Sequence, residues 1–163
     1  MCGLVGTASK DPVQDRSWIK SGRAFLKHRG PDDAGEWWSD DGRVGFGHSR
    51  LSIIDLSVSG HQPMQDKERD LSIVFNGEIY NFLDLREKLT KYGYVFKSTS
   101  DTEVILAAYD YWGTDCLTHL NGMFAFAIYD GKSKRVFLAR DPAGQKPLFY
   151  NFKNGCLKFA SEL

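Results

Sequence analysis

The sequence is most informative at Leu71-Ser72-Ile73-Val74-Phe75-Asn76-Gly77-Glu78-Ile79-Tyr80-Asn81. Its first five residues are mostly apolar, which is typical of a buried β-strand. The dipeptide Asn76-Gly77 lies between apolar runs, where it is the strongest short signal for a hairpin turn. In a second interpretation, the Asn76 side-chain amide and the Gly77 backbone N–H point at one spot and stabilise an oxyanion. The local pattern favours the turn, but both can hold, because a tight turn presents donors rigidly.

Two helices are predicted after this strand. Asn81 is placed to cap the first, whose apolar face carries Leu85 and Leu89 and which ends near Gly93. The segment Ser100-Asp101-Thr102-Glu103 has the spacing of a capping box and predicts the start of the second helix. The apolar stripe of that second helix ends at Gly113 and consists of Val104, Ile105, Ala108, Tyr111 and Trp112.

The rest of the chain predicts mainly strands. One more helix is expected before His28, with Trp18, Gly22, Phe25 and Leu26 on one side. The predicted strands are Leu4 to Ala8, Glu36 to Ser39, Arg43 to Leu51, Phe124 to Tyr129, Val136 to Ala139, Leu148 to Phe152 and Cys156 to Ala160. Strand pairs separated by helix pairs predict an α+β fold with two layers of sheet covered by helices. The order of the strands does not follow from this pattern.

Length and charge exclude several classes of protein. The 163 residues predict one domain. Lys plus Arg and Asp plus Glu both number 21, so no overall field attracts nucleic acid or a membrane surface. We see no membrane-spanning apolar run and no signal-peptide pattern, and we expect a soluble, cytoplasmic protein. Three scattered cysteines argue for a reducing compartment, and the histidine and cysteine spacings predict no metal site.

Cys2 is the first candidate for chemistry. An initiator Met before a small residue is usually removed, so we expect Met1 to be lost and Cys2 to carry a free α-amino group. Such an amine has a pKa of about 7.7–8 and can act as general base for the thiol of its own residue. Taken alone, the Met-Cys-Gly start fits an ordinary cysteine better.

Arg50 and Asp101 are candidates for binding an amino acid. An Arg at a strand end can hold an α-carboxylate in a bidentate pair, and Asp101 can bind an ammonium group. The alternatives are a surface arginine and an acid favoured by the helix dipole. A Cys–His dyad is rejected, because nothing in the spacing of His28, His48 and His61 selects one of them as a base.

Eight segments, taken together and in order, resemble the class II glutamine amidotransferases, a branch of the N-terminal-nucleophile hydrolases. The resemblance is greatest to the amino-terminal domain of asparagine synthetases and spans essentially the whole chain. The matching segments are Met1-Cys2-Gly3, His28-Arg29-Gly30-Pro31-Asp32-Asp33, Gly47-His48-Ser49-Arg50-Leu51-Ser52-Ile53, Gly60-His61-Gln62-Pro63-Met64, Asn76-Gly77-Glu78-Ile79-Tyr80-Asn81, Ser100-Asp101-Thr102-Glu103, Gly122-Met123-Phe124-Ala125-Phe126-Ala127 and Ala160-Ser161-Glu162.

This resemblance implies a four-layer αββα sandwich over residues 1–163 and hydrolysis of L-glutamine to glutamate and ammonia. It implies the following roles: Cys2 as nucleophile, Asn76 and Gly77 as oxyanion hole, Arg50 on the substrate carboxylate, Asp101 on its amino group and Glu78 beside that amine.

The resemblance also implies a partner. The ammonia would pass to an ATP-dependent synthetase domain, in cis or in trans, that is absent from this chain. ATP and Mg²⁺ are expected there, and no cofactor in this domain. Asparagine synthesis from aspartate is the leading expectation and amidation of another carboxylate, such as a sugar acid, the runner-up. A silent glutamine-binding regulatory module is the alternative from another class, and a homodimer is left open.

One segment departs from the family's pattern. In Arg140-Asp141-Pro142-Ala143-Gly144-Gln145-Lys146-Pro147-Leu148, Pro142 stands where the family usually has a basic residue. Gln145 stands where a bulky apolar residue is usual. Pro142 removes a backbone donor and a charge. Because no proposed catalytic residue changes, this departure bears on the contact with the partner domain rather than on hydrolysis.

Overall fold

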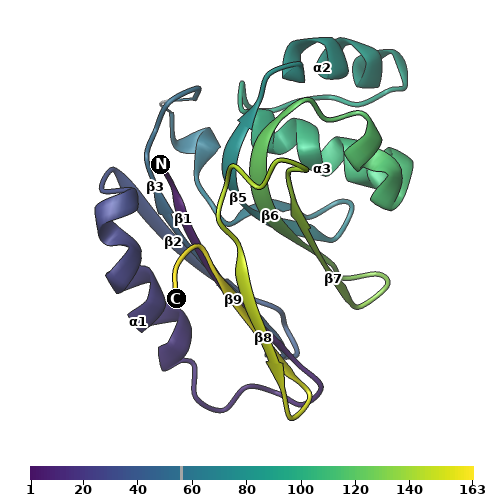
Figure 1. Cartoon of the computed structure of the whole chain (residues 1–163). Helices are drawn as coiled ribbons and strands as arrows, with labels where there is room; N and C mark the ends of the chain where they lie inside the picture. The colour runs from purple at the N-terminus through teal and green to yellow at the C-terminus, as the bar shows by residue number, and fades with distance from the viewer. Residues whose placement is uncertain (56) are drawn as a thin grey trace.

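Two antiparallel β-sheets lie face to face in the computed structural model, which describes residues 1–55 and 57–163 (Figure 1). The five-stranded sheet has the order β2 (Asp33–Trp38), β3 (Val44–Arg50), β1 (Gly3–Ser9), β9 (Cys156–Ala160) and β8 (Phe149–Lys153). The four-stranded sheet has the order β4 (Met64–Asp66), β5 (Leu71–Ile79), β6 (Gly122–Asp130) and β7 (Arg135–Arg140).

Helices cover the outer face of each sheet. The helix α1 (Ser17–Phe25) packs on the five-stranded sheet, and α2 (Phe82–Lys91) and α3 (Asp101–Trp112) lie over the four-stranded one (Figure 1). Three 3₁₀ helices complete the described secondary structure: η1 (Leu26–Arg29), η2 (Val58–Gly60) and η3 (Gly113–Thr118). None of the helices within residues 1–55 and 57–163 is long and apolar enough to cross a membrane.

Three apolar layers hold the sheets and helices together, and strand alternation assigns residues to them. Leu4 and Val74 face the gap between the sheets, where they join Phe46 and Phe159. Their neighbours point outward: Val5 packs under α1, and Phe75 packs under α2 and α3. Side chains in a strand alternate between its two faces, so each strand serves two layers at once. The predicted αββα sandwich is confirmed.

Asn76 and Gly77 do not form a hairpin turn. They lie inside β5 and pair with Ala125 and Phe124 of β6, so the local turn signal was wrong. A side chain at Gly77 would place its Cβ 2.2 Å from the Met123 carbonyl oxygen. The glycine therefore permits close approach of two strands rather than a turn.

The predicted helix starts are partly correct. The Ser100 hydroxyl accepts a hydrogen bond from the Thr102 N–H at 3.2 Å, as a capping residue should. Glu103 does not complete the capping box, because its carboxylate accepts the N–H groups of Lys97 and Ser98 instead. Asn81 precedes α2 but makes no capping bond.

The predicted face of α1 was also wrong at one position. Phe25 is 81% exposed, and Ile19 is the fully buried residue of this helix.

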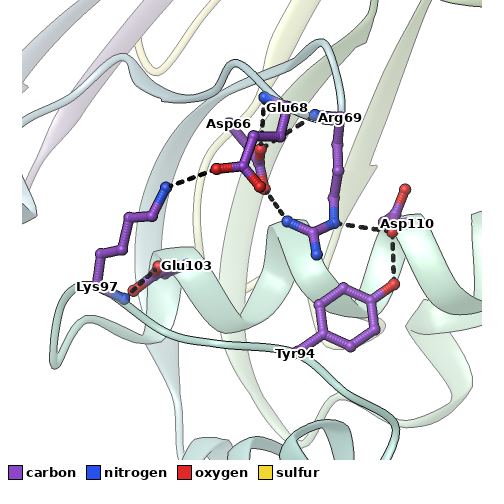
Figure 2. Close-up of polar contacts among 7 residues, drawn as sticks. All are labelled: Asp66, Glu68, Arg69, Tyr94, Lys97, Glu103 and Asp110. Carbon is purple, nitrogen blue, oxygen red and sulfur yellow. Dashed lines mark hydrogen bonds and ion pairs between the residues drawn. The ribbon is translucent and has the colours of Figure 1, made fainter.

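A polar network anchors α3 to the β4–β5 turn (Figure 2). The Arg69 guanidinium lies 2.7 Å from the Asp66 carboxylate and 3.1 Å from that of Asp110 in α3. The Tyr94 hydroxyl donates to the same Asp110 carboxylate, and the Arg69 guanidinium lies over the Tyr94 ring. The network helps to set the position of α3, whose first residue is Asp101.

Candidate active site

One cavity of about 120 Å³ brings together all six residues predicted to act on a substrate. They come from the residue before β1, the end of β3, the second half of β5 and the start of α3. Its size suits an amino acid rather than a drug-sized ligand, which needs about 300 Å³ or more. The six residues in its lining are Cys2, Arg50, Asn76, Gly77, Glu78 and Asp101.

Cys2 is held in place by two hydrogen bonds, one to its sulfur and one to its backbone carbonyl. Its sulfur accepts the Leu51 N–H at 3.3 Å, and its carbonyl accepts Arg29 Nε at 3.0 Å. Burial raises the pKa of the thiol, and the Leu51 hydrogen bond, the chain's amino terminus and Arg50 offset only part of that effect. The resting thiol is therefore neutral at pH 7 and needs a base before it can attack.

Met1 is present in the structure and lines the same cavity. Its sulfur lies 3.1 Å from the ammonium nitrogen of Lys146, a residue only 5% exposed. While Met1 is attached, the Cys2 nitrogen is an amide and cannot take a proton. Sequence reasoning missed Lys146 as a cavity residue, although it lies in the segment that departs from the family's pattern.

Asn76 presents a buried donor to the cavity. The residue is 1% exposed, and its side chain points into the gap between the sheets, as does that of Val74 two residues earlier. Within the described residues, its amide nitrogen has no hydrogen-bond partner. An unmade hydrogen bond of this kind costs about 1–3 kcal/mol, and this nitrogen could donate to an acceptor in the cavity.

The Gly77 N–H points to the edge of β5 that faces away from β6. Gly77 lies opposite Phe124 of β6. The Phe124 N–H donates to the Asp141 carboxylate and the Phe124 carbonyl accepts the Asp141 N–H, so both backbone groups of Phe124 point away from β5. In an antiparallel ladder such a residue pair exchanges no hydrogen bonds, so the Gly77 N–H points outward. The equivalent N–H groups of Phe75 and Ile79 are taken by the side chains of Gln62 and Asp101, at 2.7 and 3.1 Å.

Charges of both signs line the cavity. Arg50 is 7% exposed, and its guanidinium donates to the carbonyl oxygens of Asp55 and Ser57. Asp101 is 4% exposed, and burial raises its pKa to about 6. The nearby Glu78 charge also raises this pKa, whereas the hydrogen bond from the Ile79 N–H lowers it. Lys146 adds a second cation, and Glu78 and Asp55 add further acids to the lining. Charges of both signs in one cavity complement the zwitterion of a free amino acid.

The histidines lie elsewhere. His28 pairs with Glu162 and His61 with Asp33, both near the surface. His48 is fully buried and bonds to the Phe75 carbonyl at 2.9 Å. None of the three is among the described residues that line the cavity, which agrees with the rejection of a Cys–His dyad.

Comparisons with known proteins identify the family to which the chain belongs. Residues 1–163 match the family described as "Glutamine amidotransferase domain". Asparagine synthetase [glutamine-hydrolyzing] 1 of Bacillus subtilis is 44% identical over 99% of this chain and 26% of its own length. Asparagine synthetase [glutamine-hydrolyzing] 3 of the same organism is 42% identical over 100% of this chain and 27% of its own. The chain thus spans about a quarter of the length of these relatives.

A solved structure shares the fold. The glutamine phosphoribosylpyrophosphate amidotransferase of B. subtilis has a TM-score of 0.80 and 23% identity, over 99% of this chain and 42% of that one. At this identity the likeness speaks for the fold alone, and it confirms the sandwich of two antiparallel sheets.

Proposed function

Because this chain belongs to the glutamine amidotransferase domain family, we propose that it hydrolyses L-glutamine to glutamate and ammonia with Cys2 as nucleophile. The observation that carries the proposal is the buried Asn76 amide nitrogen, which has no hydrogen-bond partner among residues 1–55 and 57–163 and shares one cavity with the Cys2 thiol and with charges of both signs. A thiol facing spare donors is suited to attack on a carboxamide, where negative charge develops on oxygen.

The chemistry begins once Met1 is removed. The freed α-amine of Cys2 takes the thiol proton, and the sulfur forms a bond to the side-chain carbonyl carbon of glutamine. The carbonyl electron pair moves to oxygen, which the Asn76 amide and the Gly77 N–H stabilise. As the carbonyl re-forms, the C–N bond breaks and the α-ammonium returns its proton to the leaving nitrogen, which departs as ammonia. Water then attacks the thioester and releases glutamate and the thiol.

Recognition of glutamine is assigned to the charged lining. Arg50 would bind the α-carboxylate, and Asp101 the α-ammonium, with Glu78 beside it. A bound ammonium would favour the ionised form of Asp101, although burial raises its pKa in the ligand-free cavity to about 6. Only a substrate with both charges satisfies both groups, so another amide without them would bind poorly.

The ammonia would serve an ATP-dependent synthetase domain, in cis or in trans. The relatives are named asparagine synthetases, and this supports aspartate as the nitrogen acceptor, with another carboxylate as the alternative. Ammonia is protonated by water at neutral pH, so the cavity should be covered during transfer. ATP and Mg²⁺ would belong to that other domain.

The experiment that tests the proposal is the intact mass of the purified protein before and after incubation with diazo-oxo-norleucine, an electrophilic glutamine analogue. We expect loss of Met1 and one adduct on Cys2 that excess glutamine prevents. Cys156 is half-buried and provides the control, since Cys156→Ala should still form the adduct. A retained Met1 and no adduct would instead support the glutamine-binding regulatory module.

A further inference from the structure

The outer edge of β5 changes partners just before the proposed oxyanion donors. β6 runs beside the whole of β5, but β4 pairs only with Leu71, Ser72 and Ile73. Beyond Ile73, no strand within residues 1–55 and 57–163 pairs with the backbone N–H and C=O groups on this edge of β5. The N–H and the C=O of Phe75 bond to the buried side chains of Gln62 and His48 instead. The next two residues are Asn76 and Gly77.

His48 supplies one of these bonds and crosses from the other sheet. It lies in β3 between Leu4 and Gly35, and its Nε2 is 2.9 Å from the Phe75 carbonyl oxygen. Since a carbonyl only accepts, Nε2 must carry the proton. Burial lowers the pKa of His48 to about 4, which keeps the ring neutral at pH 7. The interaction is therefore a neutral hydrogen bond that joins the two sheets.

Gln62 supplies the second bond. Its side-chain oxygen accepts the Phe75 N–H at 2.7 Å, and its amide nitrogen lies 3.4 Å from the Thr102 hydroxyl in the first turn of α3. Gln62 is 4% exposed. The Gln62 side chain thus contacts both Phe75 at the edge of β5 and Thr102 in α3, the helix that begins with Asp101.

We propose that His48 and Gln62 are positioning residues that clamp the Phe75 peptide and thereby aim the Asn76 amide and the Gly77 N–H at the substrate. The inference rests on the proposed function for its catalytic consequence, but the geometry of the clamp stands apart from it. Fixing one residue on both its N–H and its C=O restricts the rotation of the strand at that point. The peptide next to Phe75 then sets where the Asn76 side chain leaves the backbone.

The test uses three single variants: the matched pair His48→Gln and His48→Leu, and Gln62→Met. His48→Gln keeps a donor near the position of Nε2, and His48→Leu has none, while neither has the aromatic ring. We expect His48→Leu and Gln62→Met to lower kcat for glutamine about 10- to 100-fold with little change in KM, because misplaced donors act in the transition state. His48→Gln should recover most of the loss. His61→Gln, which alters an exposed pair with Asp33, is the control and should leave kcat unchanged.

Two further readouts separate positioning from general damage. Alkylation of Cys2 by iodoacetamide needs no oxyanion hole, so its rate should be unchanged in all variants. The NMR signals of the Asn76 side-chain amide and the Gly77 N–H should differ between His48→Leu and His48→Gln. Identical signals and equal kcat in these two variants would overturn the clamp. If the parent protein hydrolysed no glutamine, the proposed function would fail, and the NMR comparison would still decide the clamp.

Discussion

The backbone N–H of Leu51 donates a hydrogen bond to the Cys2 sulfur at 3.3 Å. This contact joins the proposed nucleophile to the residue that directly follows Arg50, the last residue of β3. It favours the thiolate, but burial has the larger effect and raises the pKa of the thiol. Cys2 therefore rests as a thiol, and in the proposed mechanism its activation depends on the α-amine that removal of Met1 would expose.

Cys2→Ala should abolish glutamine hydrolysis without changing the fold, because it deletes the proposed nucleophile and retains a small side chain at the edge of the cavity. Ammonia release and circular dichroism would measure the two effects. Cys156→Ala, at the far end of the chain, should keep full activity. Ammonia release by Cys2→Ala at the parent's rate would show that the nucleophile is a different residue.

Asn76→Leu should lower kcat by about 10²–10³, the usual cost of losing one oxyanion donor, and leave KM nearly unchanged. Its melting temperature should not fall, because the exchange removes a buried amide nitrogen without a partner among the described residues. Asn151→Leu, the same exchange on the exposed strand β8, is the matched control. Steady-state kinetics and thermal melts check both parts, and a rise in KM with unchanged kcat would argue for a role in binding instead.

Arg50→Ala should weaken glutamine binding by on the order of 2–3 kcal/mol, seen as a large rise in KM. It should also lower the melting temperature, since the carbonyls of Asp55 and Ser57 lose their donor. Arg43→Ala, an exposed position before β3, should change neither quantity. An unchanged KM for glutamine would remove Arg50 from the binding site.

Asp101→Asn should stabilise the ligand-free protein above pH 6 while preventing glutamine turnover. The pKa of Asp101 is about 6 in the folded state and 3.8 in its ordinary state, so folded protein binds this proton more tightly. The free energy of unfolding therefore falls as pH rises through that window, and the full cost is present above it. Replacing the carboxylate by the neutral amide of Asn should therefore raise the free energy of unfolding by on the order of 2–3 kcal/mol at pH 7.5.

Thermal melts of both proteins across pH 3.5–8 would check the sign of this effect. Asp84→Asn serves as control, because Asp84 lies exposed in the first turn of α2. The difference between parent and Asp101→Asn should vanish below about pH 4. A parent protein that is more stable than Asp101→Asn above pH 6 would mean that the buried carboxylate stabilises the fold.

How much of the site could be predicted differs from residue to residue. The local sequence allowed other interpretations of Arg50, as a surface arginine, and of Asp101, as an acid favoured by the helix dipole. Only the ordered set of eight segments selected the two residues as a pair. Lys146 was not recognised as a cavity residue, because nothing in its neighbours along the chain signals contact with Met1. Gln62 and His48 were seen as parts of matching segments, but their shared partner Phe75 was not.

The sequence by itself determined the kinds and order of the three α-helices and of every described strand except β4, because alternation in strands and apolar stripes in helices depend on residues only a few positions apart. Only the tertiary structure decided that Asn76-Gly77 lies inside a strand, since β6, which pairs with it, comes more than 40 residues later. It also decided that Cys2 meets Leu51 and that β1 pairs with β9 at the other end of the chain. Such pairings depend on burying both faces of two sheets at once, and no local pattern encodes them.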